Sequence, residues 1–460
     1  MALALLAACG ERSQLRHNSD VGPTPQLVQP VKTLIPTVKI APAVRWPPGQ
    51  TPLAAAGTRV APFATGLDHP RWLHVLPNGD VLVAETNAPP RPDATGIKGW
   101  VMKLVMKRAG AGVPSANRIT LLRDADGDGN TEMRTVFLSG LNSPFGMALV
   151  GNRFYVANTD AVLEFSYTAG DTQLSGPGRQ LAALPAGPIN HHWTKGLVAS
   201  PDGSKLYVTV GSNSNVAENG MPAEEGRAAI WEIDRASGSM RLYAGGLRNP
   251  VGMAWMPAAS GAEAGSASDG SAPANAAPGN AAPASPAPTL WTVVNERDEI
   301  GSDLVPDYLT SVRDGGFYGW PYSWYGSHVD ARVQPPNPQR VAQALVPDYA
   351  LGAHVAALGL AAADTSALPG KLSGANAGAT TGVFIGLHGS WNRRPLAGYK
   401  VVYVPFVGGM PTGLPLDVLT GFVSPQGNAW GRPVGVALDR SGALLVADDV
   451  GNVVWRVTPR

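Results

Sequence analysis

One histidine pair in this chain is placed where it can do proton chemistry. His191 and His192 precede a short apolar run, and Trp193 follows them directly. The pKa of an unperturbed imidazole leaves much of it neutral near pH 7, so the ring can accept a proton. We predict that His192 is a general base that takes the proton of a substrate hydroxyl. The alternatives are that His191 has this role, or that His192 only packs beside Trp193.

An acidic loop is the second candidate for chemistry. Asp124, Asp126 and Asp128 stand at positions 1, 3 and 5 of an EF-hand-like pattern, with Gly129 at position 6. Position 12 is Thr135 instead of glutamate, and a strand-like run follows where an EF-hand has a helix. The pattern predicts a structural calcium site in a loop. An Asp/Gly turn without metal is the alternative.

The composition indicates which class of fold must position these residues. The chain of 460 residues is 44% apolar and 15% charged, and it contains 55 glycines and 42 prolines. So many turn-forming residues favour an all-β protein with many short connections over a helical one. The net charge is +1 and there is no basic run. The sequence therefore lacks the positive stripe that a nucleic-acid partner requires.

The single cysteine, Cys9, limits the redox chemistry available to the chain. One cysteine excludes an intramolecular disulfide, a Cys₄ zinc site and a Cys-x-x-Cys-His haem site. If the protein releases electrons, a separate carrier must take them. Leu6-Ala7-Ala8-Cys9-Gly10 is similar to the lipobox of bacterial lipoprotein signal peptides. This similarity implies a signal segment over residues 1–9, a lipid anchor at Cys9, and a periplasmic or cell-envelope location.

A repeated unit dominates the rest of the chain. It consists of a glycine or histidine, often a proline, a short apolar strand, a turn and a second apolar strand. The six copies begin at Gly66, Gly140, His192, Gly246, His354 and Gly431. Their average spacing of about 65 residues exceeds that of a minimal propeller blade but leaves room for loops.

Each copy is a hairpin, and further strands are expected at 101–105, 229–233, 400–404 and 453–457. A lone blade cannot bury both of its faces, whereas six blades in a ring can. The sequence therefore predicts a six-bladed β-propeller over residues 61–460. A β-sandwich is the all-β alternative, but sandwiches show no such recurrence.

Two stretches lie outside this pattern. Residues 10–60 are rich in Pro, Val and Thr, and they are expected to form a tether followed by an extended edge segment. Residues 257–289 are an Ala/Gly/Ser/Pro-rich insertion with almost no charge, expected to be a loop without chemistry.

Four stretches carry the most specific motifs of the chain. They are His191-His192-Trp193-Thr194-Lys195, Gly246-Leu247-Arg248-Asn249-Pro250, Asn295-Glu296-Arg297-Asp298 with Gly315-Gly316-Phe317-Tyr318-Gly319-Trp320-Pro321 downstream, and Trp430-Gly431-Arg432-Pro433. Together they resemble the glucose/sorbosone dehydrogenase family of propellers that use pyrroloquinoline quinone (PQQ), most of all its sorbosone branch. The likeness spans residues from about 60 to 460.

The resemblance implies how PQQ, a flat tricarboxylate, is held. Arg248 and Arg432 stand at positions that the family uses to bind it, and a guanidinium matches a carboxylate bidentately. Asn249 is placed to hydrogen-bond the quinone edge. The family also has a basic residue in the loop after the fifth copy, where this chain has Arg393 and Arg394; we choose Arg393.

The resemblance also implies calcium, bound through backbone carbonyls in the loop at Arg297 and Asp298, where a hard cation polarises the quinone. One position departs from the family. Its soluble glucose dehydrogenases have a second arginine where this chain has Val434.

The expected activity is therefore PQQ- and calcium-dependent oxidation of a sugar or aldehyde by hydride transfer, with electrons passed to a cytochrome or quinone. A metal-dependent lactone hydrolase and a propeller that binds without catalysis are the alternatives.

Overall fold

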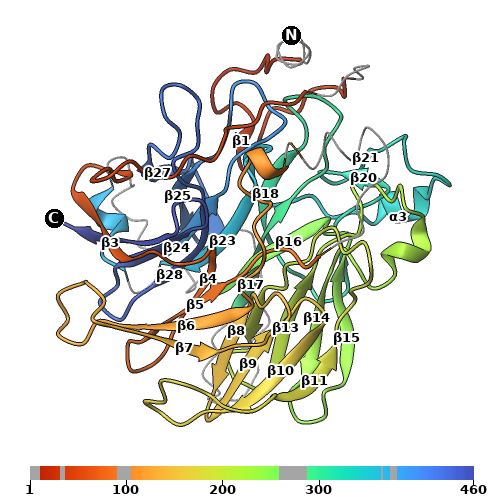
Figure 1. The fold of residues 1–460 in the computed structure, drawn as a ribbon. Helices are drawn as coiled ribbons and strands as arrows, with labels where there is room; N and C mark the ends of the chain where they lie inside the picture. The colour runs from red at the N-terminus through yellow and green to blue at the C-terminus, as the bar shows by residue number, and fades with distance from the viewer. Residues whose placement is uncertain are drawn as a thin grey trace, which may run out of the picture.

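Six β-sheets are arranged around one axis (Figure 1), and the predicted six-bladed β-propeller is thereby confirmed. The computed structural model describes residues 11–31, 37–90, 104, 106–257, 287–363, 366–372 and 381–460. Cys9 and most of the insertion at 257–289 lie outside these residues.

Each blade is built outward from the axis in chain order. The innermost strands are β4 (Pro70–Val75), β8 (Met147–Val150), β12 (Leu197–Ala199), β16 (Asn249–Met256), β23 (Ala357–Ala362) and β28 (Pro433–Leu438). The second strands are β5 (Val81–Glu85), β9 (Arg153–Ala157), β13 (Lys205–Val210), β17 (Thr289–Asn295), β24 (Thr381–Leu387) and β29 (Leu444–Asp448).

The outer half of each blade follows the same order. The third strands are β6 (Arg118–Arg123), β10 (Ala161–Ser166), β14 (Ala229–Asp234), β18 (Pro306–Ser311), β25 (Lys400–Val407) and β30 (Val453–Pro459). The fourth strands are β7 (Met133–Leu138), β11 (Arg179–Ala183), β15 (Met240–Gly245), β22 (Tyr349–Ala353), β27 (Leu416–Thr420) and β3 (Thr58–Thr65). Because β3 comes from the N-terminal side, it closes the ring by completing the last blade.

Short elements cover several outer edges. β1 (Val21–Gly22) pairs with β22, β2 (Leu53–Ala54) pairs with β27, and β19 (Gly316–Phe317) runs parallel to β15. The remaining elements are β26 (Met410–Pro411) on β25, the hairpin of β20 (Ser323–Trp324) and β21 (His328–Val329), α3 (Pro338–Ala342), η1 (Met221–Glu224) and η2 (Pro369–Lys371). Among the described residues, no helix is long and apolar enough to cross a membrane.

The third strand of the first blade differs from the prediction. We expected it at 101–105, but β6 occupies that place in the sheet at Arg118–Arg123, between β5 and β7. Residues 101–105 lie almost entirely outside the described residues. The apolar run there gave no signal that a long connection separates the second and third strands.

Apolar side chains fill the spaces between neighbouring blades. Six buried clusters are present, one for each of the six blade interfaces. The cluster that joins the last blade to the first contains Leu445 and Val454 together with Leu73 and Val83. Each blade therefore buries both faces only when the ring is complete.

A repeated glycine sets how closely the innermost strands approach. A Cβ on the glycine of one blade would strike the backbone of the next innermost strand. The pairs are Gly146 against Leu197, Gly196 against Val251, Gly252 against Leu358, Gly359 against Val434, and Gly435 against Arg71. The first blade has Trp72 at the equivalent position, and its ring lies 4.6 Å from that of Phe145. The recurring glycine of the sequence is thus a requirement of close backbone packing.

We expect Gly359→Ala to destabilise the protein by about 2–3 kcal/mol, because the new methyl group must push the fifth blade away from Val434 of the sixth. Urea denaturation of the purified variant measures this change. The control is Gly370→Ala, where an added Cβ meets nothing within 4 Å. Equal stability of the two variants would contradict the role given to the glycine ring.

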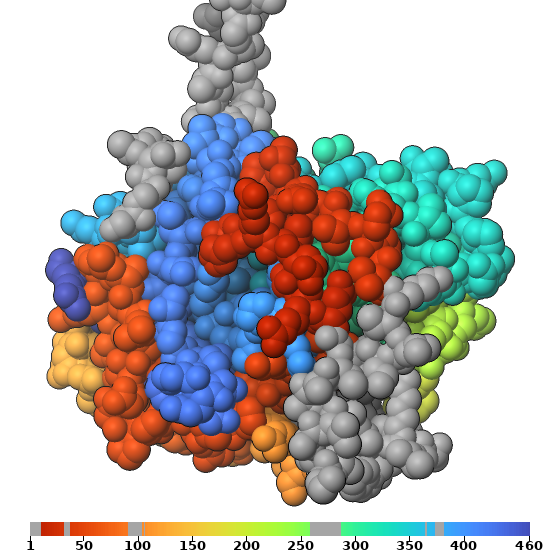
Figure 2. Space-filling model, turned by 90° about the horizontal axis from the view of Figure 1, so that it is seen from above, coloured from red at the N-terminus to blue at the C-terminus, as the bar shows by residue number. Residues whose placement is uncertain are grey.

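The segment predicted as a tether lies against one end of the propeller. We call residues 11–31 and 37–50 the N-terminal strap. Ser13 Oγ donates to Asp303 at 2.5 Å, and Lys39 N donates to the carbonyl of Trp391 at 2.8 Å. Figure 2 shows the strap, in red, across the end of the molecule seen from above. The strap therefore covers part of the end where the candidate residues gather.

Candidate functional site

The candidate residues gather at one end of the axis because of blade topology. In every blade, the connection before the innermost strand and the one after the second strand lie at the same end. We call the following residues of this end the mouth: His69, Arg71, His192, Arg248, Asn249, Asp298, His354, His388, Asn392, Arg432 and Asp449.

His192 is held in an orientation that suits a base. Its Nδ1 lies 2.8 Å from the carbonyl oxygen of Ser212 and 3.1 Å from Ser212 Oγ. A carbonyl can only accept, so Nδ1 carries the hydrogen and the lone pair lies on Nε2. The ring is half-buried, whereas that of His191 is exposed and meets it edge-on at 4.8 Å.

Asn249 lies beside His192. The space over Gly211 is bounded on one side by Asn249 Oδ1 and on the other by Cβ of His192, since a Cβ on Gly211 would strike both. Asn249 Oδ1 is buried and has no hydrogen-bond partner. The predicted base and the predicted hydrogen-bonding amide are therefore neighbours.

Arg248 is paired with Asp298, as is His354. Nη2 of Arg248 lies 3.3 Å from Asp298 Oδ2, and Nη1 donates to the carbonyl of Glu296 at 2.6 Å. Burial would raise the pKa of Asp298, but His354 and Arg248 lower it to about 2. The guanidinium that we expected to hold a cofactor thus fixes the loop after β17.

Asp449 is the centre of a second charged group. It accepts from Arg71 at 2.7 Å and lies 2.9 Å from His388 Nε2 and 3.5 Å from His69 Nε2. Burial would raise the pKa of Asp449, but these three neighbours together hold it below its ordinary value. Burial lowers the pKa of His388 to about 4, so this imidazole is neutral near pH 7.

Arg71 links this group to the loop of His192. Its guanidinium carbon lies 5.8 Å from the centre of the Trp193 ring. Arg71 is thus a mostly buried cation between the last blade, which supplies Asp449, and the third blade, which supplies Trp193.

The other two predicted arginines have different surroundings. Arg432 lies over the Tyr399 ring at 4.9 Å, and its guanidinium donates to the carbonyl of Ala41 over a long distance of 3.4 Å. Arg393 is bound to the strap, because its Nη1 lies 3.0 Å from Asp20 Oδ2 and its Nη2 lies 3.1 Å from Asp303 Oδ1. Arg432 therefore faces the mouth, whereas Arg393 anchors the strap.

Several buried polar atoms of the mouth have no hydrogen-bond partner among the residues that the structure describes. Buried polar groups are nearly always satisfied, so a cluster of exceptions indicates a ligand. The atoms are His69 Nε2, Arg71 Nε, Asn249 Oδ1, Asn392 Oδ1, Arg432 Nε and Asp449 Oδ1. They include donors from two arginines and acceptors from two amides. The two arginine Nε atoms can donate to carboxylate oxygens of an anionic ligand, whereas the amide oxygens accept from hydroxyl or N–H groups.

The loop expected to bind calcium is occupied by internal contacts. Arg297 is fully buried and donates to Glu296 and Asp330 at 2.9 and 3.0 Å. The carbonyl of Asp298 accepts from Arg332 at 3.0 Å and from Asn215 at 3.2 Å. With Arg248 and Arg332 both donating to Asp298, the residues of this loop do not fit a divalent cation as they stand.

The acidic loop keeps its predicted geometry. Oxygens of Asp124, Asp126, Asp128 and Glu132 lie within 4.8 Å of one another. The two oxygens of Asp124 already accept from Gly127 N and Gly129 N, at 2.8 and 2.9 Å. This loop joins β6 to β7 in the first blade, apart from the mouth.

Lys195 is a buried cation behind the loop of His192. Its side chain is fully buried, and its Nζ donates to the carbonyl of Trp193 at 3.3 Å. Burial, with a smaller contribution from Arg227, lowers the pKa of Lys195 to about 7. Near neutral pH this lysine therefore loses its proton easily.

We expect Lys195→Met to be more stable than the wild type at pH 6, by an amount that shrinks as the pH rises toward 10. Between pH 7 and the ordinary lysine pKa the unfolded chain keeps a proton that the folded protein has lost, so wild-type stability rises with pH there. Urea denaturation at pH 6 and pH 9 measures the difference. A difference independent of pH would show that Lys195 does not titrate in this way.

Sequence reasoning missed the group around Asp449. His69 and Arg71 lie in the first copy of the repeat and His388 follows the second strand of the fifth, but none of the three was assigned a role. One signal was available: Pro70-Arg71 stands in the first copy where Pro433-Val434 stands in the sixth. Val434 replaces the second arginine of the soluble glucose dehydrogenases in the sixth copy. Arg71 supplies a cation to the mouth from the equivalent position of the first copy.

Comparisons with known proteins match parts of the chain to two family models. A TrAA12-like model matches residues 339–460, and a model described as a domain of unknown function (DUF7133) matches residues 63–259. A protein of Borreliella burgdorferi, recorded as uncharacterized, is 23% identical over 333 residues, which are 69% of this chain and 76% of that protein.

Solved structures match almost the whole chain. A Trichoderma reesei structure titled Carbohydrate-Active Enzymes Family AA12 has a TM-score of 0.65 at 18% identity and covers 92% of this chain and 99% of its own. The holo PQQ domain of a Coprinopsis cinerea pyranose dehydrogenase has a TM-score of 0.63 at 21% identity, covering 91% and 100%. A PQQ-bound aldose sugar dehydrogenase of Streptomyces coelicolor has a TM-score of 0.50 at 16% identity, covering 88% and 100%. At these identities the likeness establishes that this chain has their propeller fold.

Proposed function

We propose that this protein is a PQQ-dependent oxidoreductase that oxidises a sugar or an aldehyde. The observation that carries the proposal is the set of unsatisfied buried polar atoms at the mouth. A site that joins buried guanidinium donors, amide acceptors and an oriented imidazole suits a polyanionic quinone beside a hydroxylated substrate.

Arg71 and Arg432 are the residues proposed to hold the carboxylates of PQQ. Each has a buried Nε without a hydrogen-bond partner. Arg71 also pairs with Asp449, through Nη1, but its Nε is unmatched, whereas Nε of Arg248 donates to the carbonyl of Asn215 at 3.4 Å. Arg393, which the sequence also favoured, pairs with Asp20 and Asp303. Asn249 and Asn392 each offer an unmatched Oδ1, which can accept from a hydroxyl or N–H group, whereas Nδ2 of Asn392 already donates to Asp298 at 2.7 Å.

His192 is proposed to remove the proton from the substrate hydroxyl. Its Nδ1–H is fixed on Ser212, so Nε2 is the atom that accepts the proton. When bound, PQQ supplies the two-electron acceptor for the hydride that leaves the same carbon. Asn249 lies beside His192 at Gly211, so it would contact the cofactor close to the proposed base.

The loop at Arg297 and Asp298 does not fit calcium, so we propose no calcium ion at the mouth. Arg297 and Asp298 were the expected ligands, but their loop is held by arginine side chains. A cation there would have to displace Arg332 or Arg248. The acidic loop at Asp124, Asp126 and Asp128 remains our proposal for a structural calcium site.

The solved structures that the chain resembles support the class of reaction. They include a pyranose dehydrogenase PQQ domain and a PQQ-bound aldose sugar dehydrogenase. We therefore propose a sugar as substrate, sorbosone among them, and a cytochrome or quinone as the external electron acceptor. We also propose lipidation of Cys9 and a place in the cell envelope.

Titration of the cofactor-free protein with PQQ tests the proposal. We expect one PQQ per chain, seen as a saturable change in quinone absorbance, and reduction of an electron-accepting dye in the presence of an aldose. Absence of binding would remove the proposal. Binding without turnover on aldoses, sorbosone and simple aldehydes would instead favour the binding propeller. Hydrolysis of a lactone without PQQ would favour the hydrolase, although Asp298 and Asp449 are both paired with cations.

A further inference from the structure

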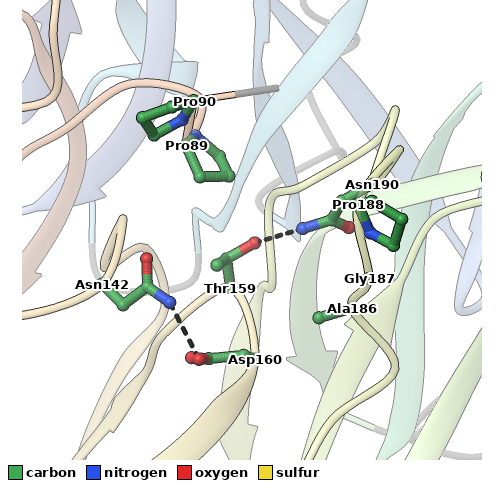
Figure 3. Close-up of a pocket in the computed structure, with 9 residues that line it drawn as sticks. All are labelled: Pro89, Pro90, Asn142, Thr159, Asp160, Ala186, Gly187, Pro188 and Asn190. Atoms are coloured by element: carbon green, nitrogen blue, oxygen red, sulfur yellow. Dashed lines mark hydrogen bonds between the residues drawn. The ribbon is translucent and has the colours of Figure 1, made fainter. Parts of the chain in front are cut away.

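A pocket of about 280 Å³ lies at the same end of the propeller as the mouth (Figure 3). Three blades contribute to it. Pro89 and Pro90 follow β5, Asn142 precedes β8, Thr159 and Asp160 follow β9, and residues 186–190 precede β12. The last of these connections continues directly into His191 and His192. The pocket therefore adjoins the loop that carries the proposed base.

The lining of the pocket combines polar and apolar surfaces. Asn142 Nδ2 donates to Asp160 Oδ2 at 2.8 Å, and both side chains are exposed on one side of the pocket. Pro89 and Pro90 lie on another side (Figure 3). None of the described residues that line the pocket is cationic, and Asp160 repels anions. The pocket thus suits a neutral ligand that carries several hydroxyl groups and an apolar face.

Hydrogen bonds fix the floor of the pocket to the His192 loop. Asn190 Nδ2 donates to Thr159 Oγ1 at 2.7 Å, and Thr159 Oγ1 donates to the carbonyl of Trp193 at 2.9 Å. Arg227 in turn donates to Asn190 Oδ1 at 3.1 Å. Asn190 and Thr159 are both almost fully buried. The pocket and the base are therefore parts of one rigid unit.

The spacing between the pocket and the base is short. Asn190 lines the pocket and His192 follows two residues later, so their Cα atoms are at most about 7 Å apart. This is within the reach of adjacent units of a short oligosaccharide.

We propose that this pocket is a subsite for the sugar unit next to the one that is oxidised, so that oligosaccharides are preferred over monosaccharides. The inference rests on the proposed function for its reaction, but the binding it describes does not require PQQ. Asn142 and Asp160 bind the hydroxyl groups of the neighbouring unit, and the proline rings pack against its apolar face.

The test compares glucose with maltose, cellobiose and lactose. Calorimetry measures binding to the cofactor-free protein, and kcat/KM is measured on the PQQ-loaded protein. In the wild type at least one disaccharide is expected to bind more tightly than glucose. Asp160→Ala and Asn142→Ala should each lower the affinity and the kcat/KM for that disaccharide by about 10-fold. Both values for glucose should stay within about 2-fold of the wild type. The matched control is Asp171→Ala, which changes an aspartate of the same blade between β10 and β11, away from the pocket.

Two results would overturn the inference: no disaccharide binds better than glucose, or both pocket variants bind it as the wild type does. Failure of the proposed function has a different outcome. If the wild type binds a disaccharide through Asp160 but oxidises no sugar, the subsite stands and the oxidoreductase proposal falls. If it oxidises glucose and disaccharides equally and the pocket variants change nothing, the subsite falls alone.

Discussion

His192→Ala is expected to lower kcat by about 10²–10⁴-fold, the usual contribution of a general base. The physical reason is the fixed tautomer: Ser212 holds the hydrogen on Nδ1, so Nε2 carries the lone pair that accepts the substrate proton. PQQ binding should stay within a few-fold, because a neutral imidazole contributes little to holding carboxylates. Dye reduction and PQQ titration, measured on the same preparation, separate the two effects.

The control for this variant is His191→Ala. The His191 ring is exposed and lies against that of His192, so its removal is expected to change kcat by less than about 10-fold. Full turnover by His192→Ala would remove the assignment of the base. Loss of turnover in His191→Ala, with His192→Ala active, would move the role to the neighbour.

Arg71→Met is expected to weaken PQQ binding by about 30- to 1000-fold, since the loss of one buried charge-assisted interaction costs about 2–4 kcal/mol. Among the described residues, Arg71 is the arginine that forms an ion pair with Asp449, and its buried Nε has no hydrogen-bond partner there. Arg71→Lys keeps the charge but not the planar pair of donors, so an intermediate loss is expected. Fluorescence or absorbance titration with PQQ measures all three proteins.

Arg241→Met is the matched control. Arg241 pairs with Glu232 and Asp314 on the exposed side of β15, far along the blade from the mouth. The Arg241→Met protein should bind PQQ with the affinity of the wild type. Because Arg71→Met can lower stability by leaving Asp449 without its cation, urea denaturation accompanies the titration. A folded Arg71→Met protein with unchanged PQQ affinity would contradict the proposed binding mode.

The sequence predicted the ring because each blade repeats the same local requirements. A hairpin of two apolar strands, a tight turn and a glycine before or within the innermost strand recurs in order along the chain. The structure shows why the glycine recurs, since Gly196, Gly252 and Gly359 each face the backbone of the next blade. Such contacts involve neighbouring blades, so the chain order already contains them.

The sequence did not predict where side chains from distant blades meet. Arg71 and Asp449 belong to the first and last blades, and only closure of the ring by β3 brings them to 2.7 Å. Arg393 was expected at the cofactor, but the strap places Asp20 beside it. No local pattern in residues 10–60 indicates that they return across the mouth.

The sequence by itself therefore determined the blades, their number and the end of the ring where His192, Asn249 and Arg432 lie, because strand periodicity and turn chemistry are local. Only the tertiary structure decided which arginine side chains line the mouth and which form ion pairs that fix the loops and the N-terminal strap. That choice depends on long-range ion pairs between buried groups, whose partners are set by the closure of the ring and by the path of the N-terminal strap.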